Sequence, residues 1–261
     1  MRNLIQLFLA VCLILSFGNI QAQNEAQQLI KEVVTAAGGI ENLRSLQDVE
    51  YQYTFQSKDK GIKDVSVERY IFDGEISFAQ YTARQYFVLP QMEGDLTQYF
   101  DGTKTVSHHN GQVITDEQAA YVGHFFRKTN FYWFTMMYKL LDPGIQFKMM
   151  EDRKVDNTNY QVVEMTFNEG VGETSDRYVL YINPETKMID QFLFTVLGFG
   201  FKEPFLMKMK YEEVDGLMLS TYRAYAPANW EGKVIKEDWT EEISTNIKFK
   251  NNFDKTNITK I

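Results

Sequence analysis

The sequence is poor in the residues that support thiol chemistry, metal binding and covalent cross-linking. Its 261 residues include one cysteine, three histidines and five prolines. The cysteine, Cys12, lies in a segment that we expect to be removed on export, so the mature chain has no thiol nucleophile, no thiolate ligand and no disulfide. The sequence therefore predicts a fold that is stabilised by its core alone.

Motifs of the common enzyme classes are also missing. The chain has no G-x-S-x-G nucleophile elbow, no H-E-x-x-H zinc motif and no G-x-x-x-x-G-K phosphate loop. His108 and His109 are adjacent on an expected strand and point to opposite faces, which makes a shared metal ion awkward. We therefore predict no catalytic residue, no metal site and no cofactor. A hydrolase that uses two carboxylates stays open as an alternative.

Basic residues are in the minority. The 27 Lys and Arg face 35 Asp and Glu, a formal net charge of −8. Residues 1–22 contain one basic and no acidic side chain, so the mature chain carries 26 minus 35, or −9. Nucleic acids and anionic membrane surfaces require a basic footprint. The charge argues against both as partners.

The N-terminus has the plan of a secretory signal peptide. Arg2 precedes an apolar run over residues 4–17, and Ala22 is a small residue at a plausible cleavage point before Gln23. The apolar run is shorter than the roughly 18 to 20 residues that span a bilayer. We expect a signal peptide over residues 1–22 and one exported domain over residues 23–261.

Most of the remaining sequence predicts antiparallel strands. Val49, Tyr51, Tyr53 and Phe55 alternate with polar residues, which is the period of a strand with one buried face. Asp-Gly and Asn-Gly pairs mark tight hairpin turns, and such short connections join antiparallel neighbours. The expected strands cover residues 49–55, 63–72, 75–84, 96–100, 104–108, 145–151, 160–168, 177–183, 188–197, 205–212, 217–225 and 234–249.

Helical periodicity occurs in three places. Apolar residues spaced by three and four predict a helix over residues 25–37, and a short helical turn follows over residues 40–46. The third stretch, residues 119–144, has far more aromatic side chains than one helical face needs. Thr115 and Gln118 have the spacing of a capping box, and residues 128–130 are expected to break this stretch into two pieces.

Two short motifs and the order of elements resemble the LolA-type outer-membrane lipoprotein-sorting proteins. The motifs are residues 176–186, DRYVLYINPET, and residues 214–221, VDGLMLST, where Ser220 stands at a position that is often proline in the family. The likeness covers most of the mature chain and is greatest to uncharacterised exported members from Bacteroidetes-type bacteria. Arg84 and Arg127 are candidates for the lid-locking arginine of the carriers only by their proximity.

The resemblance implies a mainly β fold with some α structure: a curved antiparallel sheet, or incomplete β-barrel, with helices packed on its concave side over an apolar cavity for acyl chains. We expect a periplasmic or secreted protein, without catalysis, whose partner is a lipid or a lipidated protein, with transient contacts at the inner or outer membrane. Its oligomeric state stays open. The expected lining is aromatic and aliphatic: Tyr51, Tyr53 and Phe55 from the sheet, with Phe125, Phe126, Phe131, Trp133, Phe134 and Met137 from the helices. The competing hypothesis is a structural or interaction protein whose aromatic residues simply fill its core.

Overall fold

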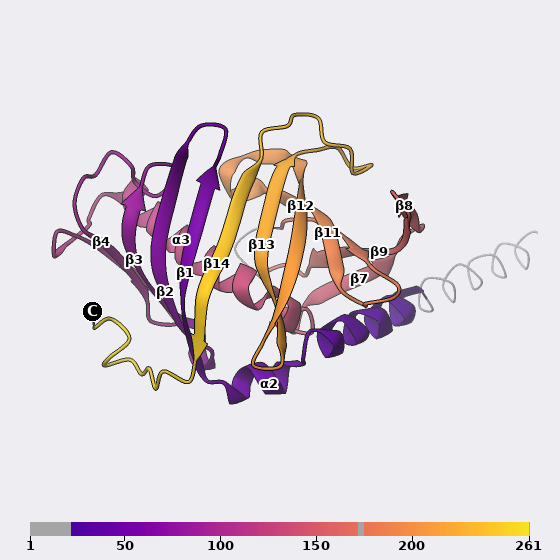
Figure 1. Ribbon diagram of the computed structural model, residues 1–261, viewed down its shortest axis with the longest axis horizontal. Helices are drawn as coiled ribbons and strands as arrows, with labels where there is room; N and C mark the ends of the chain where they lie inside the picture. The colour runs from indigo at the N-terminus through magenta and orange to yellow at the C-terminus, as the bar shows by residue number, and fades with distance from the viewer. Residues whose placement is uncertain (1–21, 172–174, 261) are drawn as a thin grey trace, which may run out of the picture.

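One curved antiparallel sheet and one long helix make up most of the molecule (Figure 1). The computed structural model describes residues 22–171 and 175–260. The expected signal peptide, residues 1–22, lies outside this part of the chain except for its last residue. Within the described residues, no helix is both long enough and apolar enough to cross a membrane.

The sheet has fourteen strands in the order β6-β5-β4-β3-β2-β1-β14-β13-β12-β11-β10-β9-β7, with β8 paired to β9 beside this path. The strands in chain order are β1 Asp48–Ser57, β2 Ile62–Ile71, β3 Ile76–Arg84, β4 Leu96–Phe100, β5 Thr105–His109, β6 Gln112–Val113, β7 Ile145–Met149, β8 Arg153–Val155, β9 Thr158–Phe167, β10 Tyr178–Ile182, β11 Ile189–Val196, β12 Phe201–Val214, β13 Leu217–Pro227 and β14 Thr240–Phe249. The edge strands β6 and β7 are at opposite ends of this order, so the described sheet is an open, incomplete barrel. The predicted fold class is confirmed.

The sheet consists of two meanders that meet in its middle. Strands β1 to β6 form the first and β7 to β14 the second, and β1 pairs with β14, placing Phe55 opposite Glu242. Tight turns produce the meanders. At Asp215 and Gly216 both φ angles are positive, 51° and 75°, as a two-residue hairpin turn with the twist of the strands requires.

Two short helices close one end of the sheet (Figure 1). Residues 22–36 are helical and bury Ile30 and Val33 completely. The chain then turns through Gly38, whose φ is 106° and where an added Cβ would lie 2.4 Å from the carbonyl oxygen of Gly216. Only glycine tolerates both conditions. Helix α2, Ile40–Ser45, follows directly, and both predicted helices are confirmed.

Helix α3, Glu117–Lys139, is continuous, so the predicted break at residues 128–130 is wrong. Asn130, one of the three residues expected to break the helix, donates to the carboxylate of Glu68 on the sheet at 3.2 Å. Its amide therefore does not compete for the helix backbone, which is how asparagine usually weakens helices. The predicted capping box is also wrong: Asp116 is the N-cap, and its Oδ1 accepts from the Ala119 N–H at 2.9 Å.

The last strand is shorter than predicted. Residues 234–239 were expected to belong to it, but β14 begins at Thr240, opposite Tyr225 near the end of β13. Before that point the chain forms a loop, with one isolated bridge between Ala228 and Val234. The Ile235 N–H still donates to the carbonyl oxygen of Pro227, the last residue of β13, but the ladder with β13 begins only at Thr240. Strands β6 and β8 were not predicted.

Candidate functional site

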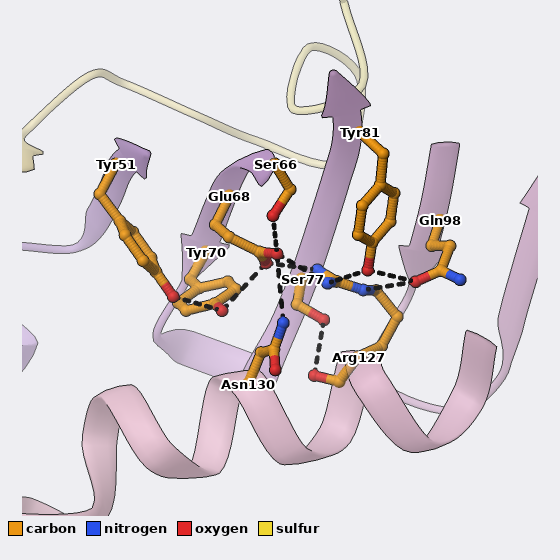
Figure 2. A network of polar contacts seen from close by, with 9 residues as sticks. All are labelled: Tyr51, Ser66, Glu68, Tyr70, Ser77, Tyr81, Gln98, Arg127 and Asn130. Carbon is orange, nitrogen blue, oxygen red and sulfur yellow. Dashed lines mark hydrogen bonds and ion pairs between the residues drawn. The ribbon is translucent and has the colours of Figure 1, made fainter. Parts of the chain in front are cut away.

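A buried ion pair fixes α3 to the first half of the sheet (Figure 2). Arg127 Nη1 lies 2.6 Å from Glu68 Oε2, and Arg127 Nη2 lies 2.9 Å from Glu68 Oε1. Both side chains are 0% exposed. Burial alone would lower the pKa of Arg127, but the Glu68 carboxylate more than offsets this, so the pKa is raised well above its ordinary value. Arg127 is therefore charged in the folded protein.

Neutral polar side chains complete the hydrogen bonding of this pair. Ser66 Oγ donates to Glu68 Oε1 at 2.7 Å, and Tyr70 Oη donates to Glu68 Oε2 at 3.0 Å. On the other side, Arg127 Nε donates to Gln98 Oε1 at 3.3 Å. A buried pair is tolerated only when its remaining hydrogen-bonding capacity is met in this way. The network in Figure 2 thus connects α3 with β2 and β4.

Close packing brings α3 onto the same half of the sheet. Gly123 lies against Ser107 on β5, where an added Cβ would be 2.4 Å from Ser107 Oγ. About three turns further along, Phe134 stacks on Tyr51 of β1, with ring centroids 4.8 Å apart. Side chains therefore fill the space between α3 and the first meander.

A second buried ion pair connects α3 to the middle of the sheet. Arg223 on β13 contacts Glu242 on β14 at 2.7 Å, and it also donates to the carbonyl oxygen of Trp133 at 3.2 Å. Both charged side chains are 4% exposed. The two buried carboxylates at the helix, those of Glu68 and Glu242, are each bound to an arginine.

Helix α3 also borders an open cavity of about 1390 Å³, whose wall includes residues of both meanders. Aromatic residues are the largest group in its wall. The polar residues in the wall include both partners of several ion pairs. The residues from α3 are Tyr121, Val122 and Phe125 to Trp133, with Lys139. The sheet and its loops contribute Tyr53, Phe55, Tyr86, Phe87, Phe167, Tyr178, Phe194, Phe199, Phe201, Phe205, Met207, Tyr225, Ile235 and Glu242, among others.

The nine residues expected to line the cavity fall into two groups. Those at the cavity wall are Tyr53, Phe55, Phe125, Phe126, Phe131 and Trp133. Tyr51, Phe134 and Met137 do not line the cavity and are packed in the main hydrophobic core, a cluster that also includes Tyr53, Phe55, Phe131 and Trp133 of the first group. The difference follows from helix geometry: Phe134 lies on the face of α3 that carries Arg127 and meets β1, whereas Trp133 lies next to it on the cavity face.

Two charged residues shape the loop at one side of the cavity mouth. The Asp64 carboxylate accepts four backbone N–H groups, from residues 85 to 88, at 2.7 to 2.9 Å. Arg84 donates to the carbonyl oxygens of Leu89, Met92 and Gly94. These bonds hold Tyr86 and Phe87 at the cavity. Arg84 thus has a local structural role.

Large apolar side chains remain exposed around the mouth of this cavity. Phe87, Phe199, Phe201 and Ile235 are 49%, 41%, 53% and 63% exposed. Phe87, Phe199 and Ile235 come from the connections between β3 and β4, β11 and β12, and β13 and β14, and Phe201 is the first residue of β12. Among the described residues, no group of three His, Cys, Asp or Glu side chains is placed to hold a metal ion.

Sequence reasoning missed the ion pairs and the loop anchored by Asp64. The sequence contained one indication of the role of Glu68. Asp64, Ser66, Glu68 and Tyr70 are alternate residues of β2, so their side chains share one face of the strand. That face is buried although it is polar, and the valines between them point the other way. Helix α3 supplies the partner that makes this burial possible.

Comparison with known proteins gives a family and a fold. A profile described as a family of unknown function (DUF6503) matches residues 103–234, about half of the chain. This stretch includes α3 and strands β7 to β13, and α3 and several of these strands contribute residues to the cavity wall. No curated protein sequence matches the chain.

Among solved structures, the chain is similar to a LolA superfamily protein from Nitrosomonas europaea, with a TM-score of 0.54 and 12% identity over 88% of this chain and 96% of that one. It is also similar to a DUF1329 family protein from Desulfovibrio piger, with a TM-score of 0.50 and 12% identity over 88% of this chain and 95% of that one. At such identity the likeness concerns the fold. The LolA-like architecture expected from the sequence is confirmed.

Proposed function

We propose that this chain, which belongs to the family of unknown function DUF6503, is an exported binding protein that holds acyl chains in its cavity without catalysis. The ligand is a lipid, or the lipid anchor of a modified protein. The signal-peptide pattern of residues 1–22 supports export, with the periplasm as the site of action. Delivery or collection of such a ligand implies transient contact with a membrane.

The observation that carries this proposal is the aromatic wall of the cavity. Its volume of about 1390 Å³ exceeds the range of roughly 300 to 1,000 Å³ that is usual for small-molecule sites. Each methylene group that such a wall removes from water contributes about 0.8 kcal/mol. A long acyl chain is therefore held tightly by apolar burial alone, and the volume leaves room for more than one chain.

The position of α3 also supports this proposal. The Arg127 ion pair and the close approach of Gly123 fix the helix to the first meander, and Arg223 of β13 fixes it to the middle of the sheet. The space on its other face is consequently not closed by movement of the helix toward the second meander. A cavity bounded by fixed elements is the usual form of a small-ligand site.

The test is binding of diphenylhexatriene, an uncharged fluorescent hydrocarbon, to the exported chain purified without detergent. The informative variant is Thr129→Trp, because Thr129 lines the cavity from α3 and the larger side chain occupies ligand volume. The matched control is Gln52→Trp, which adds the same side chain at an exposed position of β1. Far-UV circular dichroism and thermal unfolding verify that each variant is folded.

The proposal predicts saturable binding to the wild type and to Gln52→Trp, and binding weakened at least tenfold in Thr129→Trp. Equal binding by the two variants would place the probe outside the cavity. Absence of saturable binding to the wild type would leave the aromatic residues as core packing and overturn the proposal.

A further inference from the structure

The turn between β11 and β12, residues 197–200, reaches across to α3 at the cavity. The ring of Phe199 in this β11–β12 turn packs against those of Tyr121 and Phe125 on α3, with centroids 5.8 and 4.5 Å away. Tyr121 Oη also donates to the carbonyl oxygen of Gly198 at 3.3 Å. All four of these residues line the cavity. The turn therefore connects the second meander with the helix where a ligand would enter or leave.

This connection is weaker than the others that hold the cavity wall together. The hydrogen bond from Tyr121 is longer than the roughly 2.5 to 3.0 Å that is usual between a hydroxyl and a carbonyl oxygen. Phe199 is 41% exposed, so its contact with the helix buries only part of the ring. By contrast, Asp64 holds the β3–β4 loop through four backbone N–H groups, and the buried pair of Arg127 and Glu68 holds α3. Of these three parts of the wall, the β11–β12 turn separates most easily.

The backbone beside the turn has the features of a hinge. The register of the β11–β12 ladder shifts just before the turn, between Phe194 and Val196, and the chain at such an irregularity is not held by regular ladder hydrogen bonds. Gly200, at the end of the turn, has a φ of 78°, and an added Cβ there would meet no atom within 4 Å. Glycine changes its backbone conformation at little steric cost. The turn can therefore rotate on the β12 side while the Leu197 N–H stays bound to Asp176 on the β11 side, at 2.9 Å.

We propose that the β11–β12 turn is the gate through which acyl chains enter the cavity, and that Phe199 is the residue that keeps this gate closed. This inference rests on the proposed function and adds the route of entry to it. Because α3 is fixed to the sheet by its buried ion pair, opening moves the turn and not the helix. Opening exposes aromatic surface of both partners, which an entering acyl chain then covers. A gate of this kind sets the rates at which a ligand enters and leaves.

The test locks the turn to α3 with a removable cross-link. Residues 23–261 contain no cysteine, so in the double variant Tyr121→Cys, Phe199→Cys a bis-maleimide with a disulfide in its linker joins only the two introduced thiols. Stopped-flow mixing with diphenylhexatriene measures entry by the rise in fluorescence. Because a locked gate blocks exchange, we expect entry to be at least about tenfold slower in the cross-linked protein than after a reductant has cleaved the linker. The control is Glu41→Cys, Arg44→Cys, an exposed pair on α2, in which the same cross-link leaves the entry rate unchanged.

A second variant tests the gate without a cross-link. Phe199→Ala removes the ring that contacts α3, and entry should become about twofold to about tenfold faster, the equivalent of one aromatic pair. A wall residue without a gating role would change the exit rate and not the entry rate, so the entry rate is the decisive readout. Equal entry rates before and after cleavage of the linker would overturn the inference and leave the acyl-binding proposal standing. If the cysteine variant does not fold or does not cross-link, an entry rate in Phe199→Ala no faster than in the wild type would do the same. Failure of the wild type to bind diphenylhexatriene would remove both.

Discussion

Arg127 of α3 and Glu68 of β2 form a bidentate ion pair, with N–O distances of 2.6 and 2.9 Å, in which neither side chain has any exposed surface. The two residues lie in different elements, so the pair sets where the helix sits on the sheet. It places α3 over the first meander. The cavity borders the rest of the helix and is lined by residues of both meanders.

We expect Arg127→Met to lower the free energy of unfolding by about 3 to 5 kcal/mol, because it leaves the buried Glu68 carboxylate without a cation. The double variant Arg127→Met, Glu68→Met should recover most of this loss, since no unpaired charge remains. Urea denaturation of both variants measures the difference. A single variant as stable as the wild type would show that water reaches the carboxylate.

Gly123→Ala should destabilise the protein by about 1 to 3 kcal/mol, although alanine favours helices over glycine by roughly 1 kcal/mol. The new methyl group would lie 2.4 Å from Ser107 Oγ. Ser107→Ala removes that oxygen, which lacks a partner, and should restore stability when combined with Gly123→Ala. If Gly123→Ala alone raises the melting temperature, α3 is not packed this tightly against β5.

Asp64→Ala should loosen the loop at the cavity mouth. It removes the acceptor of four backbone N–H groups from residues 85 to 88, and hydrogen bonds to a charged group contribute about 1.5 to 3 kcal/mol each when measured singly. We expect a loss of stability of at least about 2 kcal/mol. In this variant, hydrogen–deuterium exchange at residues 85–88 should be faster than in the wild type. Exchange in the β13–β14 loop, residues 228–239, should be unchanged and serves as the internal control.

Two phenylalanines of α3 should respond differently to truncation. Phe134→Ala opens a hole in the core against Tyr51 and should cost about 3 to 5 kcal/mol of stability. Phe125→Ala, at the cavity wall beside Phe199, should change stability by less than about 1 kcal/mol. It should weaken diphenylhexatriene binding about fivefold instead. The reverse pattern would contradict the assignment of the two helix faces.

Local sequence patterns were sufficient for most of the strands and for their antiparallel order. Alternation identified β1, and the Asp-Gly turn at residues 215–216 identified the hairpin between β12 and β13. These features depend on neighbours in the chain. The open barrel followed from the family resemblance more than from any residue pattern.

Long-range pairing could not be predicted in the same way. Hydrophobicity favours an orientation of β2 with Val65 and Val67 inward, whereas the structure buries Ser66 and Glu68. The choice depends on Arg127, which is 59 residues away from Glu68 in the chain. The same applies to the cavity lining: composition indicated an apolar helix, but only the rotation of α3 separates Trp133, at the cavity, from Phe134, in the core.

The most direct test of the central claim is native mass spectrometry of the exported protein isolated from its own source without detergent, followed by organic extraction and lipid analysis. The account predicts a stoichiometric, non-covalent adduct whose mass shifts correspond to species with acyl chains, and which is lost in Thr129→Trp. A protein that is free of lipid as isolated, and that takes up no acyl lipid when one is supplied, would contradict it.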